Sequence, residues 1–415
     1  MIIRARVAVT MDGPPVENGA VAISGNRIVD VGKFGEVKSR NTGEILELGE
    51  RALLPGLINA HCHLDYTCLR GKIAPQKSFA DWIRAINAAK AKLLPEDYLA
   101  SINEGFVEAK RFGTTTIASL TAFPDLVAKI DEPIRAWWFA ELIDVRKPER
   151  ANAIVDVAVE SLKDVDNWGL APHALFTASA DLFRYCELLA RGKNILLTTH
   201  LAESREEMAM FHDGAGPLYD FMKEIGRDMS DCGGGTPLCR FVELAGRGGS
   251  PNRPRATGVN RPYFSWIIVH LNELAESDFD LLARSTEKFH VVHCPRSHKY
   301  FGHSPFRFER LRALGNICLG TDSLASNDDL SLFAEMRQFQ TTFPNVSPEE
   351  VLSMVTVNPA RALRQENALG KIRPGFYADL VSVPCARSTR LRRVFEEIVA
   401  FDRPVEWMMV DGETK

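Results

Sequence analysis

Two histidines separated by one residue follow an apolar run in the segment 53–65, whose sequence is LLPGLINAHCHLD. The run at 57–60 predicts a buried strand, and in a strand the side chains two residues apart point to the same side. His61 and His63 can therefore reach one metal ion from the same face. Histidines at this spacing also occur as an ordinary polar strand end, so the pair alone does not establish a metal site.

Further histidines and one aspartate end other apolar segments of the chain. They are His173 in APHALF, His200 in LLTTHLAES, His270 in WIIVHLNE, His293 in VVHCPRS and Asp322 in LGTDS. A single histidine at a strand end is more often a structural residue than a ligand. The whole chain has ten histidines, and six of them at predicted strand ends are hard to explain by core packing. The joint pattern indicates one shared site.

The elements that must position these residues alternate between strands and helices. Eight apolar segments predict strands: LINA, TTTIASL, PIRAWWFAELI, NWGLAPHALF, NILLTTHLAES, YFSWIIVHLNE, FHVVHCPRS and NICLGTDS. Most are separated by helix-like stretches such as PERANAIVDVAVESLKD. Eight such units predict an α/β fold, the (β/α)₈ or TIM barrel. In that architecture the C-terminal strand ends meet at one mouth, where catalysis takes place.

Both ends of the chain read as short strands separated by turns, with no helix. We therefore expect residues 1–54 and 368–415 to form the two parts of one small β-sandwich, and residues 55–367 to form the barrel. The region 214–262 is rich in Gly, Pro and Arg and gives no clear helix signal. It predicts a long excursion over one barrel mouth, which is either a functional lid or a plain surface insertion.

Composition argues against several kinds of partner. A net charge of −4 gives no reason to expect nucleic acid or an anionic membrane surface. No apolar run approaches the roughly 20 residues that span a bilayer, and the N-terminus lacks a cleavable signal pattern. The eight cysteines are scattered without a CxxC pair, which favours free thiols in a reducing compartment. We expect a cytoplasmic protein that acts on a small molecule.

These motifs resemble those of a known family along the whole chain. PGLINAHCHLD, HLAE, WIIVHLNE, LGTDS and the closing GKIRPGFYADLV are similar to the amidohydrolase superfamily, in its cytosine/adenosine deaminase and triazine-hydrolase-like branch. The resemblance implies a distorted TIM barrel with a small β-sandwich assembled from both chain ends. That architecture agrees with the pattern of strands and helices read from the sequence.

By this resemblance His61, His63, His200 and Asp322 would bind one divalent metal ion. Three neutral imidazoles and a carboxylate suit Zn²⁺, our first choice, and also Fe²⁺. Relatives with two metals usually need a modified lysine at the end of the fourth strand, and GLAPHALF has no lysine. We therefore expect one metal ion, which would lower the pKa of a bound water from 15.7 towards roughly 7–9.

The resemblance also implies catalytic roles for three residues. Glu203, three residues after His200, would carry a proton from the water to the substrate, a task that suits a carboxyl group in a dry pocket. The alternative is a surface glutamate that opens the next helix. His270 would orient the attacking water or polarise the leaving group. Asp322 would both bind the metal and accept the proton of the water.

Four residues are expected to contact the substrate: His173, Arg70, Trp82 and Ser323. His173 matches a substrate-contacting position in the branch that deaminates adenosine-like compounds, although a structural role is the alternative. Trp82 is equally compatible with packing in the core of its helix. The sequence leaves open the roles of three further histidines near the predicted mouth: His293, His298, which departs from the usual asparagine, and His303.

The pattern HxH, HxxE, H and TDS is most similar to deaminases of amino-heterocycles. We expect attack of a metal-activated water on the amino-bearing ring carbon of an adenosine-type nucleoside derivative, with loss of ammonia. One alternative is a guanine-, cytosine- or triazine-type deaminase or chlorohydrolase. Another is a cyclic amide hydrolase of the imidazolonepropionase kind. A non-enzymatic scaffold conflicts with the complete ligand set. Dimers are common in the family, so a homodimer is compatible with the sequence.

Overall fold

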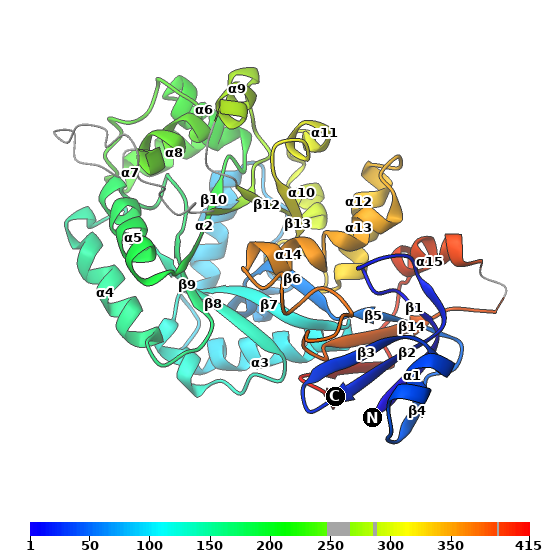
Figure 1. Ribbon diagram of the computed structural model, residues 1–415. Helices are drawn as coiled ribbons and strands as arrows, with labels where there is room; N and C mark the ends of the chain where they lie inside the picture. The colour runs from blue at the N-terminus through cyan, green and yellow to red at the C-terminus, as the bar shows by residue number, and fades with distance from the viewer. Residues whose placement is uncertain (247–265, 285–288, 388–389) are drawn as a thin grey trace, which may run out of the picture.

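The centre of the computed structural model is a sheet of eight parallel strands in the order β13-β12-β11-β10-β9-β8-β7-β6 (Figure 1). The structure describes residues 1–246, 266–284, 289–387 and 390–415. The strands are β6 (Leu57–Cys62), β7 (Thr114–Thr121), β8 (Arg135–Leu142), β9 (Trp168–Pro172), β10 (Leu196–Leu201), β11 (Trp266–His270), β12 (His290–His293) and β13 (Asn316–Leu319). A parallel bridge between Cys62 and Asp322 brings the two outer strands together, so the sheet nearly closes into a barrel.

Burial on both faces of this sheet explains why its strands read as continuous apolar runs. Every residue of β6, β7 and β11 is buried, as parallel strands covered by helices require. Alternate residues along a strand pack into different hydrophobic clusters. In β7, Ala118 and Leu120 join a cluster with Ile58 and Ala60 of β6, whereas Ile117 joins the larger cluster that includes the helices.

Helices surround the barrel on its outside (Figure 1). Ser78 begins α2 because its side chain accepts a hydrogen bond from the Asp81 backbone N–H at 3.0 Å. Helix α3 ends before Gly113, whose φ of +80° suits a residue without a Cβ. The bounds are α2 (Phe79–Lys90), α3 (Pro95–Arg111), α4 (Ala151–Leu162), α5 (Ala180–Lys193), α6 (Arg205–Asp213), α7 (Pro217–Glu224), α8 (Pro237–Gly246), α9 (Glu276–Arg284), α10 (Pro295–Phe301), α11 (Phe308–Leu311), α12 (Leu332–Thr342), α13 (Pro348–Ser353) and α14 (Val357–Ala362).

A second, mixed sheet is built from both ends of the chain, which lie side by side in Figure 1. Its path is β16-β15-β14-β5-β1-β2-β3, and β4 pairs with β1. The strands are β1 (Ile2–Ala8), β2 (Val16–Ser24), β3 (Arg27–Lys33), β4 (Ile45–Glu47), β5 (Arg51–Pro55), β14 (Leu380–Pro384), β15 (Trp407–Val410) and β16 (Glu413–Thr414). The expected fold class, a distorted TIM barrel with a β-unit from both chain ends, is confirmed. The three domain boundaries stay a prediction.

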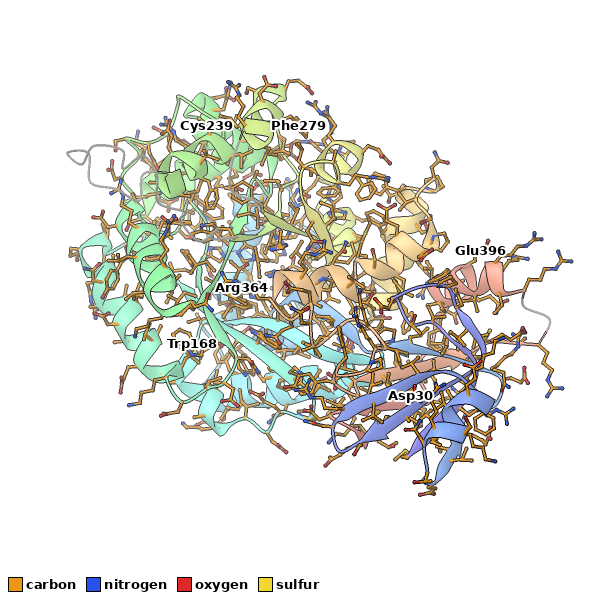
Figure 2. The ribbon with its side chains drawn as sticks, in the orientation of Figure 1. Asp30, Trp168, Cys239, Phe279, Arg364 and Glu396 are labelled. Carbon is orange, nitrogen blue, oxygen red and sulfur yellow. The ribbon has the colours of Figure 1, made fainter. Side chains whose placement is uncertain are left out.

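One expectation about the local structure is wrong, and one question that the sequence left open is answered. The end segments are not free of helices, because they contain α1 (Phe34–Arg40) and α15 (Val394–Ala400). On β3, Asp30, labelled in Figure 2, accepts a hydrogen bond from Arg40 of α1 at 2.9 Å. The sequence of the region 214–262 carries no clear helix signal, and the structure places α7 and α8 in it, in contact with α2 and α5. The excursion of this region over a barrel mouth stays a prediction. Residues 247–262 of that region lie outside the described residues.

Two further findings concern membrane-spanning helices and cysteines. Within the described ranges, no helix is both long and apolar enough to cross a membrane. All eight cysteines fall in those ranges and are free thiols, as the scattered spacing predicted.

Arg135, at the start of β8, joins the barrel to the mixed sheet. Its guanidinium contacts the Asp379 carboxylate at 3.4 Å and the Asp411 carboxylate at 2.5 Å. The side chains of Arg135 and Asp379 are 12% and 5% exposed. Burial raises the pKa of Asp379, and the Arg135 charge opposes that shift. A carboxylate this deeply buried depends on its cationic partner.

Replacing Arg135 with methionine should lower the free energy of unfolding by about 3 kcal/mol, because the substitution leaves the buried Asp379 carboxylate without its cation. Urea denaturation of the two proteins measures the difference. Lys163→Ala, which breaks an exposed ion pair with Glu160, should leave the unfolding midpoint nearly unchanged. An Arg135→Met protein with the midpoint of the wild type would contradict this account of the junction.

Candidate active site

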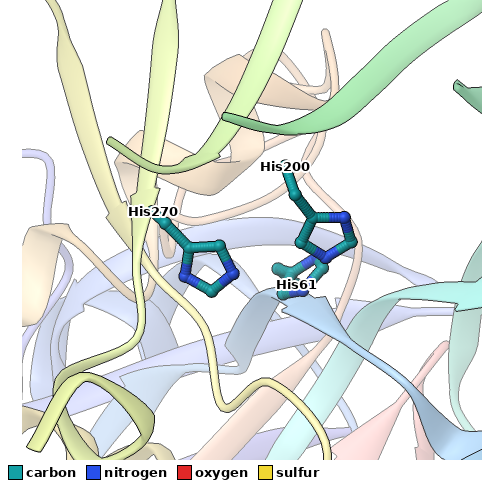
Figure 3. Close-up of side chains that lie close together, drawn as sticks. All are labelled: His61, His200 and His270. Atoms are coloured by element: carbon teal, nitrogen blue, oxygen red, sulfur yellow. The ribbon is translucent and has the colours of Figure 1, made fainter. Parts of the chain in front are cut away.

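Four histidines and one aspartate converge where the barrel strands end. His61 lies in β6, His200 in β10 and His270 in β11, and Figure 3 shows these three rings pointing to one centre from three strands. His63 directly follows β6, and Asp322 follows β13. All five are buried. The structure therefore brings together residues that are up to 261 positions apart in the chain, as the strand-end pattern predicted.

Four of these side chains present donor atoms to a common point. His63 Nε2 lies 3.4 Å from His200 Nε2, and Asp322 Oδ1 lies 3.7 Å from His61 Nε2 and 3.9 Å from His63 Nε2. Ligands arranged tetrahedrally around Zn²⁺ at about 2.0–2.1 Å would be separated by about 3.3–3.4 Å. The donor set and its spacing fit a divalent metal ion. His270 also groups with His61 and His200 within 4.8 Å.

The hydrogen bonding of the rings agrees with such an ion. His200 Nδ1 lies 3.0 Å from the His173 carbonyl oxygen, which can only accept, so Nδ1 carries the proton and Nε2 is free to bind a metal. Neither nitrogen of His61 has a hydrogen-bond partner among the described residues, and His63 Nδ1 has none either. Because buried polar atoms without partners are costly, His61 Nε2, which faces the common point, calls for a partner that the protein chain does not supply.

The electrostatics favour the protonation states that a metal requires. Burial, followed by the neighbouring histidines, lowers the pKa of His63 well below its usual value and lowers the pKa of His200 to about 3. Burial alone would raise the pKa of Asp322, but His61 and the other imidazoles hold that pKa well below its usual value. The imidazoles of His63 and His200 are thus neutral, and the Asp322 carboxylate is ionised.

Asp322 is held by three donors and by a strained backbone. Its Oδ2 accepts hydrogen bonds from Ser297 Oγ at 2.6 Å and from Ser326 Oγ at 3.4 Å, and its Oδ1 accepts from the Ser323 backbone N–H at 2.8 Å. Asp322 has a φ of +57°, and positive values also occur at Ala202 and His270. Such conformations cost free energy and persist where the surrounding structure imposes them, typically at functional sites.

Glu203 lies just after β10 and is buried rather than exposed at the start of the next helix. Its Oε1 is 3.6 Å from His270 Nε2. Burial, together with the charges of Asp322 and Glu207, raises the pKa of Glu203 well above its usual value. A carboxyl group in this state can carry a proton near neutral pH.

Sequence reasoning missed two residues that hold Glu203 in place. The Glu207 carboxylate accepts hydrogen bonds from the backbone N–H groups of Ala202 at 3.1 Å and Glu203 at 2.7 Å. Asn272 Nδ2 donates to the Glu203 carbonyl at 3.0 Å, so Asn272 Oδ1 is free to accept from His298 Nδ1 at 3.0 Å. The signal in the sequence that could have identified Asn272 is its position in the HLNE motif. Glu207 was hidden in a run of charged residues that is also typical of a solvated helix face.

A pocket lies beside the common point, since His63, His200 and Asp322 line it, and helix α2 forms one of its walls. Aromatic and aliphatic side chains face it, including Phe79, Trp82 and Phe176, and Lys90 also lines it. Glu206, in α6, accepts hydrogen bonds from the backbone N–H groups of Phe79 and Ala80 and so holds the start of α2. The pocket combines an apolar wall with polar groups at its base, as binding sites for small molecules usually do.

Three of the four expected substrate contacts lie at this pocket. His173, Trp82 and Ser323 line it, and Trp82 also packs edge-on against Phe301 with the ring centroids 4.9 Å apart. Arg70 is the exception. It is not among the residues that line the pocket, and its guanidinium pairs instead with Glu108 of α3. The structure thus does not bring Arg70 to the pocket, and its contact with the substrate stays a prediction.

The three histidines left open by the sequence lie beside this site. His293 stacks on Phe306 with the ring centroids 4.0 Å apart, His298 supports Asn272, and His303 packs against Phe301. Glu141, Tyr66 and Lys90 also line the pocket, and sequence reasoning did not select them. Glu141 and Lys90 belong to no motif, so only the tertiary structure places them here.

The chain is similar in sequence to known proteins along most of its length. Two of these are 5-methylthioadenosine/S-adenosylhomocysteine deaminases. The one from Halothermothrix orenii is 28% identical over 394 residues, covering 90% of this chain and 82% of that protein. The one from Pyrococcus furiosus is 27% identical over 405 residues, covering 93% and 87%.

Solved structures show the same fold. An adenosine deaminase from Xanthomonas campestris, described with bound zinc, superposes with a TM-score of 0.80 at 26% identity, covering all of this chain and 92% of that one. The Helicobacter pylori aminofutalosine deaminase, in complex with methylthio-coformycin, gives a TM-score of 0.85 at 19% identity, covering 100% and 99%. The sequence profile described as "Amidohydrolase family" matches residues 52–415. Because this match spans most of the chain, the protein belongs to the amidohydrolase family and is, as expected, a hydrolase of carbon–nitrogen bonds.

Proposed function

We propose that this protein is a metal-dependent hydrolytic deaminase of an amino-heterocycle and that its substrate is an adenosine-type nucleoside derivative. The proposal rests on one observation above all: four buried donor atoms converge beside a buried carboxyl group whose pKa is raised. The names of the relatives, which match nine-tenths of the chain, support the choice of substrate class.

In this proposal His61, His63, His200 and Asp322 hold one divalent ion, Zn²⁺ in the first place and Fe²⁺ in the second. The zinc in the Xanthomonas campestris relative supports that order. Such an ion, when bound, lowers the pKa of a water from 15.7 towards about 7–9. The neutral state of the buried imidazoles leaves their nitrogens free to act as ligands.

In the proposed reaction Glu203 transfers a proton and His270 orients the water. Deamination replaces the ring C–NH₂ by C=O and releases ammonia, so both protons of the attacking water must move: one to the neighbouring ring nitrogen and one to the leaving amino group. The raised pKa of Glu203 suits a carboxyl group that takes a proton and returns it within one turnover. His270 Nε2, 3.6 Å from Glu203 Oε1, orients the water, and Asp322 accepts its proton at the other side.

The pocket wall suits a flat ring. Phe79, Trp82 and Phe176 offer aromatic surfaces, against which a heterocycle can stack. His173 and Ser323 supply polar contacts at the base of the pocket. A small molecule is therefore the proposed partner, and the homodimer common in the family stays a prediction.

Ammonia release is the direct test of this function. Metal-loaded protein should release ammonia from adenosine derivatives in a panel that also contains guanine, cytosine and amino- or chlorotriazines. If ammonia or chloride is released only from guanine, cytosine or the triazines, the proposed nucleoside substrate is wrong and the substrate is one of those rings. No release from any ring, with one metal ion bound per chain, would overturn the deaminase and leave cyclic amide hydrolysis as the reaction.

Glu203→Gln should retain the metal and lose turnover by about 10²–10⁴-fold, because the ligands stay intact while the proton carrier is removed. Steady-state kinetics together with metal analysis of the same sample checks both parts. Glu160→Gln, a matched change on the surface helix α4, should behave like the wild type. Normal turnover in the Glu203→Gln protein would remove this residue from the mechanism.

Asp322→Ala should lose both bound metal and activity, since it deletes the anionic donor at the common point. Metal content after dialysis, measured by atomic emission, gives the result independently of any substrate. A fully metallated Asp322→Ala protein would show that other donors, such as His270, complete the ligand set.

A further inference from the structure

Glu141 is a buried carboxylate in the pocket that the proposed reaction does not use. It lies near the end of β8 (Arg135–Leu142), and its side chain is 3% exposed. Its Oε1 lies 3.8 Å from His63 Nδ1 and 3.9 Å from His173 Nε2. A carboxylate accepts hydrogen bonds only, and both of its nearest ring neighbours can donate one.

His63 needs an acceptor at this position. Its Nε2 faces the common point, 3.4 Å from His200 Nε2 and 3.9 Å from Asp322 Oδ1. A neutral imidazole that binds a metal through Nε2 carries its proton on Nδ1. His63 Nδ1 is buried without a hydrogen-bond partner, and Glu141 supplies the one carboxylate oxygen within 4.0 Å of it in the described part of the chain.

The ring of His63 has a fixed plane, so its Nδ1 has a fixed direction. Tyr66 stacks on one face with the centroids 5.4 Å apart and the planes 9° apart. His200 stacks with its centroid also at 5.4 Å and its plane at 13°. A hydrogen bond requires the 3.8 Å separation between Glu141 Oε1 and His63 Nδ1 to shrink by less than about 1 Å.

Tyr66 links helix α2 to the surroundings of Glu141. Lys90 Nζ donates to Tyr66 Oη at 2.6 Å, and the Tyr66 ring stacks on His63. Burial, followed by the charge of the nearby Glu141, raises the pKa of Tyr66. Glu141 therefore lies in a buried group of side chains that also holds the His63 ring.

We propose that Glu141 is a positioning residue of the metal site: it accepts the Nδ1–H of His63 and fixes that ring as a ligand through Nε2. A carboxylate in this place makes the imidazole a stronger donor to the metal, and loss of such a partner typically weakens metal binding by about 10–100-fold. This inference rests on the metal site of the proposed function. It adds a residue that no sequence motif identifies.

The test measures zinc affinity without any substrate. Apo protein is titrated with Zn²⁺ against a chromophoric chelator, for the wild type, Glu141→Ala and Glu141→Gln. Glu141→Ala should bind zinc about 10–100-fold more weakly. Glu141→Gln keeps the shape and a neutral acceptor, so its loss should be smaller. Glu187→Gln, which changes a buried glutamate on α5 paired with Arg191, should match the wild type.

The thermal unfolding midpoint of each apo protein shows whether a variant that binds zinc more weakly is still folded. If Glu141→Ala does not fold, the affinity of Glu141→Gln decides. Unchanged zinc affinity in a folded variant would overturn the inference and leave the proposed function intact, with Glu141 then facing the substrate only. A wild-type protein that binds no divalent metal would overturn the proposed metal site, and this inference with it.

Discussion

Closure of a parallel sheet forces all eight strands to end at one mouth, and the chemistry of this protein depends on that constraint. β6 and the end of β13 meet through the bridge between Cys62 and Asp322. This contact places the aspartate beside His61, although the two residues belong to opposite ends of the barrel sequence. Rings from β10 and β11 approach the same point from the other side (Figure 3). A sheet that stayed open would separate these donors by the width of the barrel.

Two carboxyl groups at this mouth have pKa values that move in opposite directions. Imidazoles surround Asp322 and hold its pKa well below the usual value, whereas Glu203 lies in a buried place near other acidic groups and its pKa rises. One carboxyl group is therefore suited to binding a cation and the other to carrying a proton. Pairs of groups with separated pKa values are typical of acid–base sites. Their environments, and not their residue types, separate the roles.

The sequence by itself determined the architecture and the main candidates of the site. Continuous apolar segments predicted the eight strands because a parallel sheet is buried on both faces. The positions of His61, His63, His200, His270 and Asp322 at segment ends predicted their convergence, since parallel strands share one C-terminal edge. The spacing of two residues between His61 and His63 and of three residues between His200 and Glu203 are local properties. They can be read from the sequence without knowing which segments pack together.

Only the tertiary structure decided which other side chains surround those candidates. Arg70 follows the HCHLD motif closely, yet its guanidinium pairs with Glu108 outside the pocket lining. Glu141 belongs to no motif, yet it lies 3.8 Å from a ring nitrogen of His63. The helices α7 and α8 were equally hidden, because Gly and Pro obscured their short patterns. The physical reason is common to all three: contacts between distant segments depend on how helices and loops pack over the barrel, and no local spacing encodes that packing.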